Sequence, residues 1–343
     1  MREINTDRAR AGKKSGFGHR YLDMARPSQH NRPMKNGYNT PHPIATTGST
    51  YVVQAYAKIN LTLDVLGRRA DGYHDLATVM QTIDLYDTIS LTTTADKQLR
   101  LFCSQTELNT DDNLALRAAQ ALLHYCGIEQ GLDIELHKRI PVAAGLGGGS
   151  SDAATVLLAL QTWWQLALSA DEMLSLAAEL GSDVPFFLTG GLALCEGRGE
   201  RVTPLPLHWP AALRWLLLLK PAIGVSTATV FRNLPPDDYT DGSHSRAVTT
   251  ALRNRQAVES ADLHNGLERS VLERYPRVAQ ARADLLHAGA TLVRLSGSGP
   301  TLFAPFAGLT QAALVEQRLR EQGYEVYLTR PIYSDNVHAY VFS

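Results

Sequence analysis

A run of glycine and serine between a strand pattern and a helix pattern is the feature that most constrains this chain. Gly145-Leu-Gly-Gly-Gly-Ser-Ser151 follows the alternating segment Leu132–Ile140 and precedes an Ala- and Leu-rich helical pattern from Asp152 to about Leu166. Glycines permit positive φ angles, so several backbone N–H groups can converge on one anion. The helix that follows adds unpaired N–H groups and its positive dipole end. The segment therefore predicts a phosphate-binding unit rather than a plain flexible turn.

This motif differs from two other phosphate-binding loops. No Gly-Lys-Ser/Thr follows the glycines, so it is not a Walker A loop, and Ser150 stands where GxGxxG has its last glycine. The hydroxyl of Ser150 or Ser151 can cap the helix or bind a phosphate or Mg²⁺. A dinucleotide-binding oxidoreductase is disfavoured by Ser150 and by the lack of a regular βαβ rhythm.

A second predicted strand carries polar residues suited to phosphoryl transfer. Residues 55–65 alternate strictly between apolar and polar, which predicts one buried and one polar face. Lys58 and Asn60 share the polar face. A lysine on a half-exposed strand is usually only solvated, but phosphoryl transfer needs a positive charge near the transferred group. Lys58 becomes a candidate catalytic residue if a carboxylate lies beside it.

Asp183, in Gly181-Ser-Asp-Val-Pro-Phe-Phe187, is the candidate carboxylate. It follows a predicted helix over residues 170–180 that ends at Gly181. Taken alone, Asp183 is more simply interpreted as the cap of a turn that begins near Pro185. Beside a cation it could instead orient or deprotonate a hydroxyl nucleophile. The sequence does not show whether Asp183 and Lys58 meet.

Two further turns are candidate parts of a binding site. In Asp71-Gly-Tyr-His74, Tyr73 and His74 are predicted at an exposed loop tip, where they could stack on a base and hydrogen-bond its edge. An ordinary turn is the simpler interpretation of this segment. The turn Gly297-Ser298-Gly299 either covers phosphates or forms a hairpin bend.

Charge and cysteine content exclude several classes of protein. Residues 1–47 carry nine basic and three acidic side chains, and the rest of the 343 residues carries 24 basic and 31 acidic ones. A net-acidic body disfavours nucleic-acid binding. Three separated cysteines favour neither a disulfide framework nor structural zinc, and eleven histidines without ligand spacing predict no metal site formed by protein ligands alone. No stretch approaches the ~18 apolar residues of a membrane span. We expect a cytoplasmic protein without nucleic-acid or membrane partners, and organelle transit of the Arg-rich leader is the lesser alternative.

Irregularly mixed strands and helices predict the α+β class. Residues 1–48 have little apolar periodicity and are predicted to be a mobile basic extension. A hinge is predicted near residues 205–210, before a hydrophobic strand at 213–220. The predicted domains are therefore an N-terminal one at 49–207 and a C-terminal one at 208–335, followed by a tail at 336–343.

Together these motifs resemble those of the GHMP small-molecule kinases. Lys58, the loop Pro141–Ser151, Asp183 and the turn at 297–299 occur in the family's order, and the similarity covers about residues 51–335. It implies a two-domain fold, with an N-terminal domain like the second domain of ribosomal protein S5 and a ferredoxin-like C-terminal domain. It also implies ATP and Mg²⁺ as cofactors and a small-molecule substrate, bound by a monomer or homodimer. The stretches 57–61, 69–74, 145–154 and 181–187 resemble one member that acts on a cytidine diphosphate-linked methylerythritol.

The resemblance implies roles for individual residues. Asp183 corresponds to the catalytic base and Lys58 to its polarising partner. The implied ATP-binding residues are Pro141, Val142, Ala143, Ala144, Gly145, Leu146, Gly147, Gly148, Gly149, Ser150 and Ser151, with Asn113, Leu114 and Lys138 at the adenine. The implied substrate-binding residues are Asn60, Thr227, His74 and the pair Tyr73 and Phe231 on either side of cytosine, with Gly297, Ser298 and Gly299 nearby.

Two alternatives lie close to this interpretation. A GHMP kinase acting on homoserine, mevalonate or a sugar would share the phosphate loop but would not need the Tyr73–Phe231 pair. A nucleotide-binding regulator that has lost catalysis is disfavoured because Lys58 and Asp183 are both present. The leader departs from the family's usual pattern, in which the strand of Lys58 lies near the start.

Overall fold

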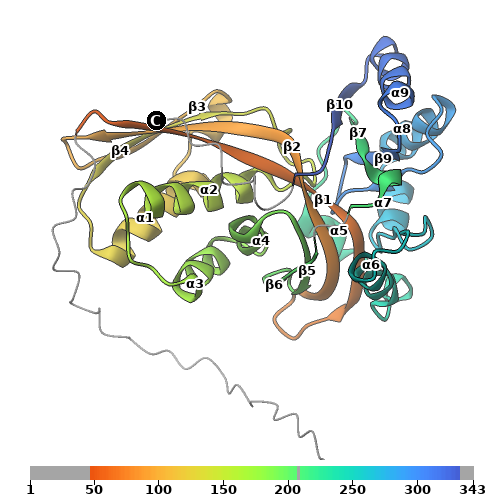
Figure 1. Ribbon diagram of the computed structural model, residues 1–343, viewed down its shortest axis with the longest axis horizontal. Helices are drawn as coiled ribbons and strands as arrows, with labels where there is room; N and C mark the ends of the chain where they lie inside the picture. The colour runs from red at the N-terminus through yellow and green to blue at the C-terminus, as the bar shows by residue number, and fades with distance from the viewer. Residues whose placement is uncertain (1–46, 207–208, 333–343) are drawn as a thin grey trace, which may run out of the picture. The chain divides into compact units, whose positions relative to one another are not determined.

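The computed structural model describes residues 47–206 and 209–332. Within these ranges the chain forms two sheets, each covered by helices, which confirms the predicted α+β class (Figure 1). Nearly all of the predicted extension, the predicted boundary at 207–208 and the predicted tail at 336–343 lie outside the described residues. No helix in the described ranges is long and apolar enough to span a bilayer.

The first sheet is built around the long strand β2 (His74–Thr94), and its order is β3-β4-β2-β5-β6 with β1 paired along β2. One end of β2 pairs with β5 through residues 76–81, and the other pairs with β4 through residues 88–94. β3 and β4 run parallel, and the other pairs in this sheet run antiparallel. The remaining strands are β1 (Thr50–Arg68), β3 (Leu99–Cys103), β4 (Gly131–His137), β5 (Leu192–Gly197) and β6 (Arg201–Pro204).

Strand β1 differs from the expected half-exposed strand, because both of its faces are buried between residues 55 and 65. Ala57 and Ile59 pack into a hydrophobic core on one face. On the other face Lys58 and Asn60 are only 3 % and 2 % exposed. The prediction of a solvated polar face was therefore wrong. Strict alternation shows which side chains share a face of a strand, but not whether the polar face meets water.

Helices α1 to α4 cover one face of the first sheet (Figure 1). The helix predicted over 170–180 is confirmed as α3, whereas the helix predicted from Asp152 begins earlier, at Gly148. The strand predicted to reach Ile140 ends at His137, because the next N–H groups bond to side chains instead of a neighbouring strand. The N–H of Lys138 donates to the Ser104 hydroxyl, and those of Arg139 and Ile140 donate to the Asp87 carboxylate. These elements are η1 (Thr106–Leu108), α1 (Leu114–Cys126), α2 (Gly148–Trp163), α3 (Ala170–Leu180) and α4 (Val184–Thr189).

The second sheet is antiparallel with the order β10-β7-β9-β8. The strand predicted at 213–220 is β7, whose four consecutive leucines are fully buried because it lies inside the sheet with both faces covered. The strands are β7 (Trp215–Lys220), β8 (Arg294–Leu295), β9 (Leu302–Phe306) and β10 (Glu325–Thr329). The helical segments of this half are η2 (Ala211–Leu213), α5 (Thr227–Arg232), η3 (Pro236–Asp238), α6 (Ser243–Arg253), α7 (Glu268–Arg274), α8 (Pro276–His287) and α9 (Leu309–Glu321).

A shared hydrophobic core joins the two halves and positions the glycine-rich loop. Ile59 of β1, Leu218 of β7 and Phe303 of β9 pack in this core together with Ala144 and Leu146 of the loop. All five side chains are at most 2 % exposed. The loop is thus anchored by two buried apolar side chains, one on each side of Gly145.

Candidate active site

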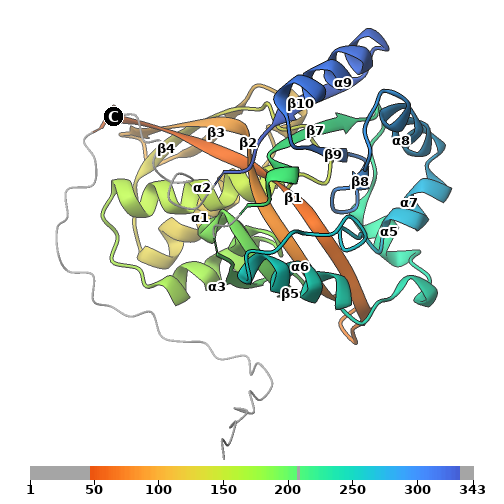
Figure 2. The same ribbon diagram turned by 45° about the vertical axis from the view of Figure 1, so that its right-hand side comes forward.

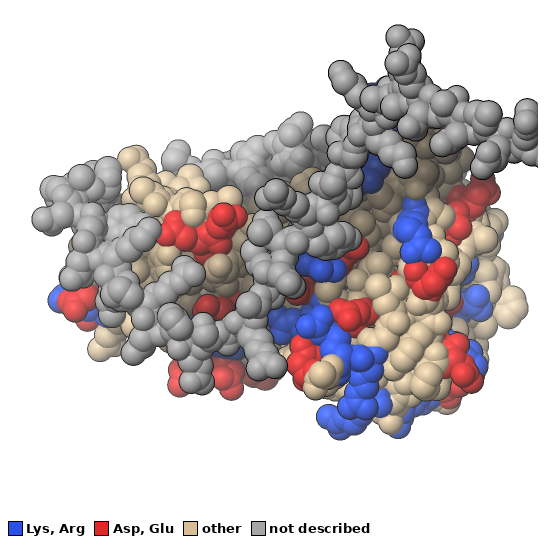
Figure 3. Space-filling view, turned by 90° about the horizontal axis from the view of Figure 1, so that it is seen from below, with Lys and Arg blue, Asp and Glu red and all other residues tan. Residues whose placement is uncertain are grey.

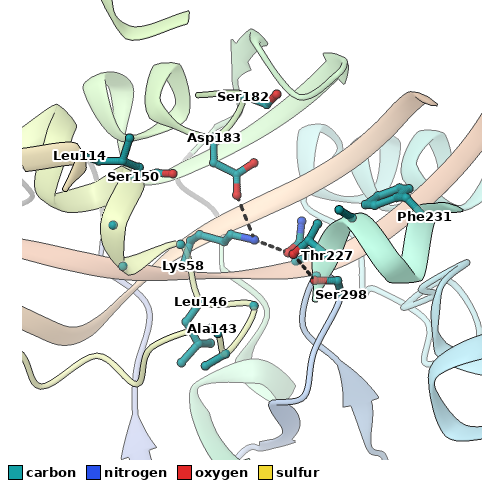
Figure 4. A pocket seen from close by; sticks show the side chains of 18 of the residues that line it. Lys58, Leu114, Ala143, Leu146, Ser150, Ser182, Asp183, Thr227, Phe231 and Ser298 are labelled. Atoms are coloured by element: carbon teal, nitrogen blue, oxygen red, sulfur yellow. Dashed lines mark hydrogen bonds and ion pairs between the residues drawn. The ribbon is translucent and has the colours of Figure 1, made fainter. Parts of the chain in front are cut away.

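A cavity of about 970 Å³ lies between the first sheet, the glycine-rich loop and helix α5 (Figure 4). It collects nearly all of the residues implied by the resemblance. Of these residues, Ser151 and Gly299 do not line it. The predicted residues that do are Lys58, Asn60, Tyr73, His74, Asn113, Leu114, Lys138, Pro141, Val142, Ala143, Ala144, Gly145, Leu146, Gly147, Gly148, Gly149, Ser150, Asp183, Thr227, Phe231, Gly297 and Ser298.

Lys58 and Asp183 meet in this cavity. The Lys58 ammonium lies 3.5 Å from the Asp183 carboxylate, although the two residues are far apart in the sequence (Figure 4). The lysine side chain is 4 % exposed and that of the aspartate is 32 % exposed, so the carboxylate is the more accessible partner. Asp183 does occupy the N-cap position of α4, but its side chain makes no capping hydrogen bond. The simpler interpretation of Asp183 as a helix cap is therefore not supported.

A chain of hydrogen bonds fixes the orientation of the Lys58 ammonium. Lys58 donates to the side-chain oxygen of Asn60 at 2.6 Å, and the Asn60 amide nitrogen donates to the Thr78 hydroxyl at 2.8 Å. Thr78 in turn donates to the backbone oxygen of Thr62 at 2.5 Å. Because every member is buried, the chain leaves the ammonium little freedom to turn away from Asp183.

The start of helix α2 offers unpaired backbone donors to the cavity. The N-cap is Gly147, with φ of 72°, and it supplies no side-chain cap. The N–H groups of Gly148, Gly149 and Ser150 belong to the first turn, where no intrahelical acceptor is available. Ser151 differs from the prediction, because its hydroxyl donates inward to the backbone oxygen of Tyr56 and its N–H bonds to Gly147. Its hydroxyl holds the helix against β1 and is not directed to the cavity.

The glycine-rich loop also packs directly on the turn at residues 296–299. At Gly145, with φ of 77°, an added Cβ atom would overlap the backbone oxygen of Ser296. The Ser296 hydroxyl donates to the backbone oxygen of Gly145 at 3.1 Å. Gly297-Ser298-Gly299 forms the bend between the paired strands β8 and β9, and Gly297 and Ser298 line the cavity. The turn is thus both a hairpin bend and a wall of the site.

A buried ionic cluster holds both ends of the glycine-rich loop. The Lys138 ammonium lies 2.5 Å from the Asp87 carboxylate and 2.7 Å from that of Asp152. Asp87 also accepts hydrogen bonds from the N–H groups of Arg139 and Ile140, before the loop, and Asp152 lies in the helix after it. Burial raises the pKa of Asp152 to about 7. Sequence analysis did not identify Asp87 or Asp152, because no local pattern links β2 to α2.

The start of helix α1, with Asn113 as its N-cap and Leu114 as its first residue, also lines the cavity. The Asn113 side chain caps this helix by accepting from the N–H of Ala115 at 2.9 Å, and it donates to the backbone oxygen of Leu108. Leu114 is the first residue of the helix and lines the cavity. These contacts hold a partly apolar wall on the loop side of the cavity.

The opposite side of the cavity carries aromatic residues. Tyr73 is 54 % exposed, as expected for a loop tip, but His74 is only 6 % exposed. The prediction that both lie at an exposed tip was therefore wrong for His74, which begins β2 and packs against Phe231 with ring centroids 5.3 Å apart. Burial, with a smaller contribution from Arg68, lowers the pKa of His74 below its usual 6.5. The imidazole is consequently neutral at neutral pH and can both donate and accept a hydrogen bond.

Two further contacts complete this side. The Thr227 hydroxyl lies 2.7 Å from that of Ser298, which connects the start of α5 to the turn (Figure 4). Arg198, which the sequence analysis did not identify, lines the cavity and lies over the Tyr73 ring at 5.0 Å. A single arginine between two glycines carries no recognisable signal in the sequence.

Comparisons with known proteins show which family the chain is similar to. Residues 113–191 match the family described as GHMP kinases N terminal domain, and residues 250–325 match GHMP kinases C terminal. A 4-diphosphocytidyl-2-C-methyl-D-erythritol kinase of Geobacillus sp. strain WCH70 is 45 % identical over 74 % of this chain and 86 % of the relative. The enzyme of the same name from Pelotomaculum thermopropionicum is 43 % identical over 80 % of this chain and 96 % of the relative.

Solved structures show the same fold. A crystal structure of 4-(cytidine 5'-diphospho)-2C-methyl-D-erythritol kinase superposes with a TM-score of 0.69 at 34 % identity, covering 82 % of this chain and 98 % of that one. A homoserine kinase from Cytophaga hutchinsonii gives a TM-score of 0.67 at 20 % identity, covering 83 % of this chain and 96 % of that one, and shows the fold alone.

The matched family and the relatives show that the chain is a kinase, and it belongs to the GHMP kinase family. Within that family it groups with the relatives named 4-diphosphocytidyl-2-C-methyl-D-erythritol kinase. The resemblance described from the motifs is thereby confirmed, and with it the two-domain GHMP fold. Membership of this family also supports ATP as the phosphate donor.

Proposed function

We propose that this kinase transfers the γ-phosphate of ATP to the 2-hydroxyl of 4-diphosphocytidyl-2-C-methyl-D-erythritol. The observation that carries the proposal is the Lys58–Asp183 pair, whose charged groups lie 3.5 Å apart in the same cavity as the uncapped start of α2. The names of the relatives supply the identity of the acceptor.

ATP occupies the side of the cavity formed by the glycine-rich loop. The N–H groups of Gly148, Gly149 and Ser150 bind phosphate oxygens, because the first turn of a helix gives them no intrahelical acceptor and they lie at the positive end of α2. Asn113, Leu114 and Lys138 form the wall against the adenine. Little covalent chemistry is required of the protein in phosphoryl transfer, so alignment and charge stabilisation supply most of the catalysis.

Asp183 acts as the base on the acceptor. As the hydroxyl oxygen attacks the γ-phosphorus, the bond from that phosphorus to the bridging oxygen breaks, ADP leaves, and the hydroxyl proton passes to the Asp183 carboxylate. Lys58 donates to Asn60 and faces Asp183, which leaves a third N–H for the acceptor oxygen or the transferred group. Its positive charge favours the developing negative charge.

Ser150 fits a Mg²⁺ ion bound beside the phosphates. Mg²⁺ prefers oxygen ligands and retains several waters, and Ser150 at the start of α2 lines the cavity (Figure 4). Its hydroxyl would hold the ion directly or through water. When bound, Mg²⁺ neutralises charge on the β- and γ-phosphates.

The acceptor's cytosine lies between Tyr73 and Phe231. Both rings line the cavity, and Phe231 already packs beside His74. The neutral His74 imidazole recognises the edge of the base. Asn60 and Thr227 also line the cavity, and we assign them to the part of the acceptor between its cytosine and its 2-hydroxyl.

We place the two domains at residues 49–207 and 208–335, as the sequence suggests. In support, the two sheets fall within residues 50–204 and 215–329.

We also place the enzyme in the cytoplasm. In support, its three cysteines are free, which suits a reducing compartment.

Consumption of ATP by the purified full chain tests the proposal. We expect turnover with 4-diphosphocytidyl-2-C-methyl-D-erythritol and none above background with homoserine or mevalonate. Turnover with homoserine or mevalonate instead would assign a different GHMP activity. ATP binding without turnover on any acceptor would favour a regulator that has lost catalysis.

A further inference from the structure

Three potential metal ligands from distant parts of the chain meet outside the cavity. Asp64 belongs to β1, His244 to the first turn of α6, and His264 to the segment before α7. One ligand atom from each lies within 4.8 Å of the others. The two imidazole rings are stacked, with centroids 4.2 Å apart and an angle of 22° between them. Figures 1 and 2 both show α6 beside β1, which is the packing that brings these residues together.

The carboxylate of Asp64 is fully buried and has no cationic partner among the described residues. One of its oxygens accepts from the Thr240 hydroxyl at 2.7 Å. The other accepts from the N–H and the hydroxyl of Ser245, at 2.8 and 2.6 Å. Buried charges in proteins are generally paired with an opposite charge or bound to a metal ion. The Asp64 carboxylate accepts hydrogen bonds only from neutral groups of the described residues, so none of these bonds supplies a positive counter-charge.

His264 adds a buried nitrogen without a partner. Its Nε2 atom is inaccessible to solvent and forms no hydrogen bond with any described residue. An imidazole nitrogen that makes no hydrogen bond can instead bind a metal ion.

We propose that Asp64, His244 and His264 together bind one Zn²⁺ ion. Two imidazole nitrogens and one carboxylate oxygen are a ligand set that zinc accepts, with water at the fourth position. Zinc–ligand distances are about 2.0–2.2 Å, so the three atoms must approach one another by roughly 1 Å. His244 is the more accessible ligand, partly exposed at the start of α6, so its side chain is the one that would make that movement. Thr240 and Ser245 already hold the carboxylate, as second-layer partners do in metal sites.

The position of this site assigns it a structural role. The residue after His264 is Asn265, whose amide donates to the backbone oxygens of Leu295 and Gly297 at 2.9 and 2.8 Å. The His264 backbone oxygen accepts from the N–H of Leu63 at 2.7 Å. A bound ion would therefore fasten β1, α6 and the segment that supports the turn at 297–299. None of its three ligands lines the cavity, so the ion takes no part in the phosphoryl transfer.

Zinc titration of the full chain, stripped of metal by a chelator, tests the proposal. We expect one equivalent of Zn²⁺ to bind by calorimetry, and Co²⁺ in its place to give the intense visible bands of a tetrahedral site. His264→Gln and His244→Gln should each weaken binding about 100-fold or more, because even loss of a second-layer partner costs 10–100-fold. The matched control is His287→Gln, at the exposed end of α8, which should bind zinc as the wild type does.

Two further measurements separate loss of the zinc site from loss of folding and from zinc binding elsewhere in the chain. Thermal unfolding without metal should give similar midpoints for wild type and both histidine variants, and saturating zinc should raise only the wild-type and control midpoints. The predicted N-terminal extension, residues 1–48, contains three other histidines that could bind zinc, His19, His30 and His42. Replacing all three by Gln should leave zinc binding unchanged. Absence of stoichiometric binding, full-strength binding by His264→Gln, or loss of binding in the triple variant would each overturn the proposal.

Discussion

The two sides of the cavity are built in different ways. The loop side comes mostly from one continuous segment, residues 141–150, whose backbone N–H groups are its main polar feature. The opposite side is assembled from β1, the start of β2, α5 and the turn at 297–298, and it presents side chains. Backbone donors suit a phosphate chain that every kinase of this kind must hold. Side chains suit an acceptor that differs between kinases, so specificity can change without altering the loop.

The largest expected effect lies where the two sides meet. Asp183→Ala removes the proposed base, which contributes about 10²–10⁴-fold in rate, so kcat should fall by roughly a thousandfold. ATP affinity should change little, because the loop side is untouched. Steady-state kinetics together with calorimetric ATP binding check this. Asp183→Asn is the matched variant, which keeps the shape but not the base, and near-normal kcat in either would contradict the assignment.

A substitution within the glycine-rich loop should weaken ATP binding and also lower the free energy of unfolding. Gly145→Ala places a Cβ against the Ser296 backbone oxygen at a residue with positive φ. Forcing an alanine into that conformation costs about 1–2 kcal/mol before any clash is counted. We expect at least that loss in the free energy of unfolding, measured in urea, and a higher KM for ATP. Gly67→Ala is the control, because its added Cβ meets no atom within 4 Å. Equal stability of the two variants would argue against the close packing of loop and turn.

A pair of truncations separates the two sides directly. Phe231→Ala should raise the KM for the acceptor about tenfold, because stacking on a base contributes roughly 1–3 kcal/mol, and should leave the KM for ATP unchanged. Leu114→Ala should do the reverse, since Leu114 lies on the loop side. Bisubstrate kinetics on both variants measure the two constants. If each variant raised both constants alike, the two sides would not be separate binding regions.

The smallest expected effect depends on pH. Burial lowers the pKa of His74 below 6.5, so the ring is neutral at neutral pH and gains a proton only in more acidic solution. Below pH 6.5 the unfolded chain binds a proton at His74 before the folded chain does. The free energy of unfolding that is present above pH 6.5 is therefore partly lost as the pH falls through the lowered pKa. The KM for the acceptor should therefore stay constant from pH 8 to 6.5 and rise a few-fold below that. His74→Gln, which cannot titrate, should not show this rise, and a rise of the same size in that variant would exclude His74 as its source.

The sequence predicted the residues of the loop side of the cavity better than those of the opposite side, and the reason is physical. Gly145–Ser150 and the helix after them form a local unit, so their pattern is visible in consecutive residues. The meeting of Lys58 with Asp183 and the burial of His74 depend on packing between distant elements. The same is true of the Asp87–Lys138–Asp152 cluster and of the group formed by Asp64, His244 and His264. No spacing along the chain encodes those contacts.

Charged side chains outside the cavity show a similar limit. On the described part of the face in Figure 3, basic and acidic side chains lie beside one another. Composition gives the balance of charge but not this mixing, which depends on where each side chain emerges from the fold. The glycine-rich loop does not meet this limit, because its prediction rests on the backbone and not on where side chains emerge from the fold.

The most direct test of the proposed reaction is the position of the transferred phosphate. Phosphorus NMR of the product made by the full chain should show the diphosphate signals of the acceptor retained and one new phosphomonoester signal. Because the carbon that bears the 2-hydroxyl also bears the methyl group and has no hydrogen, the new signal should show no three-bond coupling to a proton on its own carbon. A new signal coupled to such protons would place the phosphate on another hydroxyl and would contradict the arrangement of Asp183, Lys58 and the acceptor.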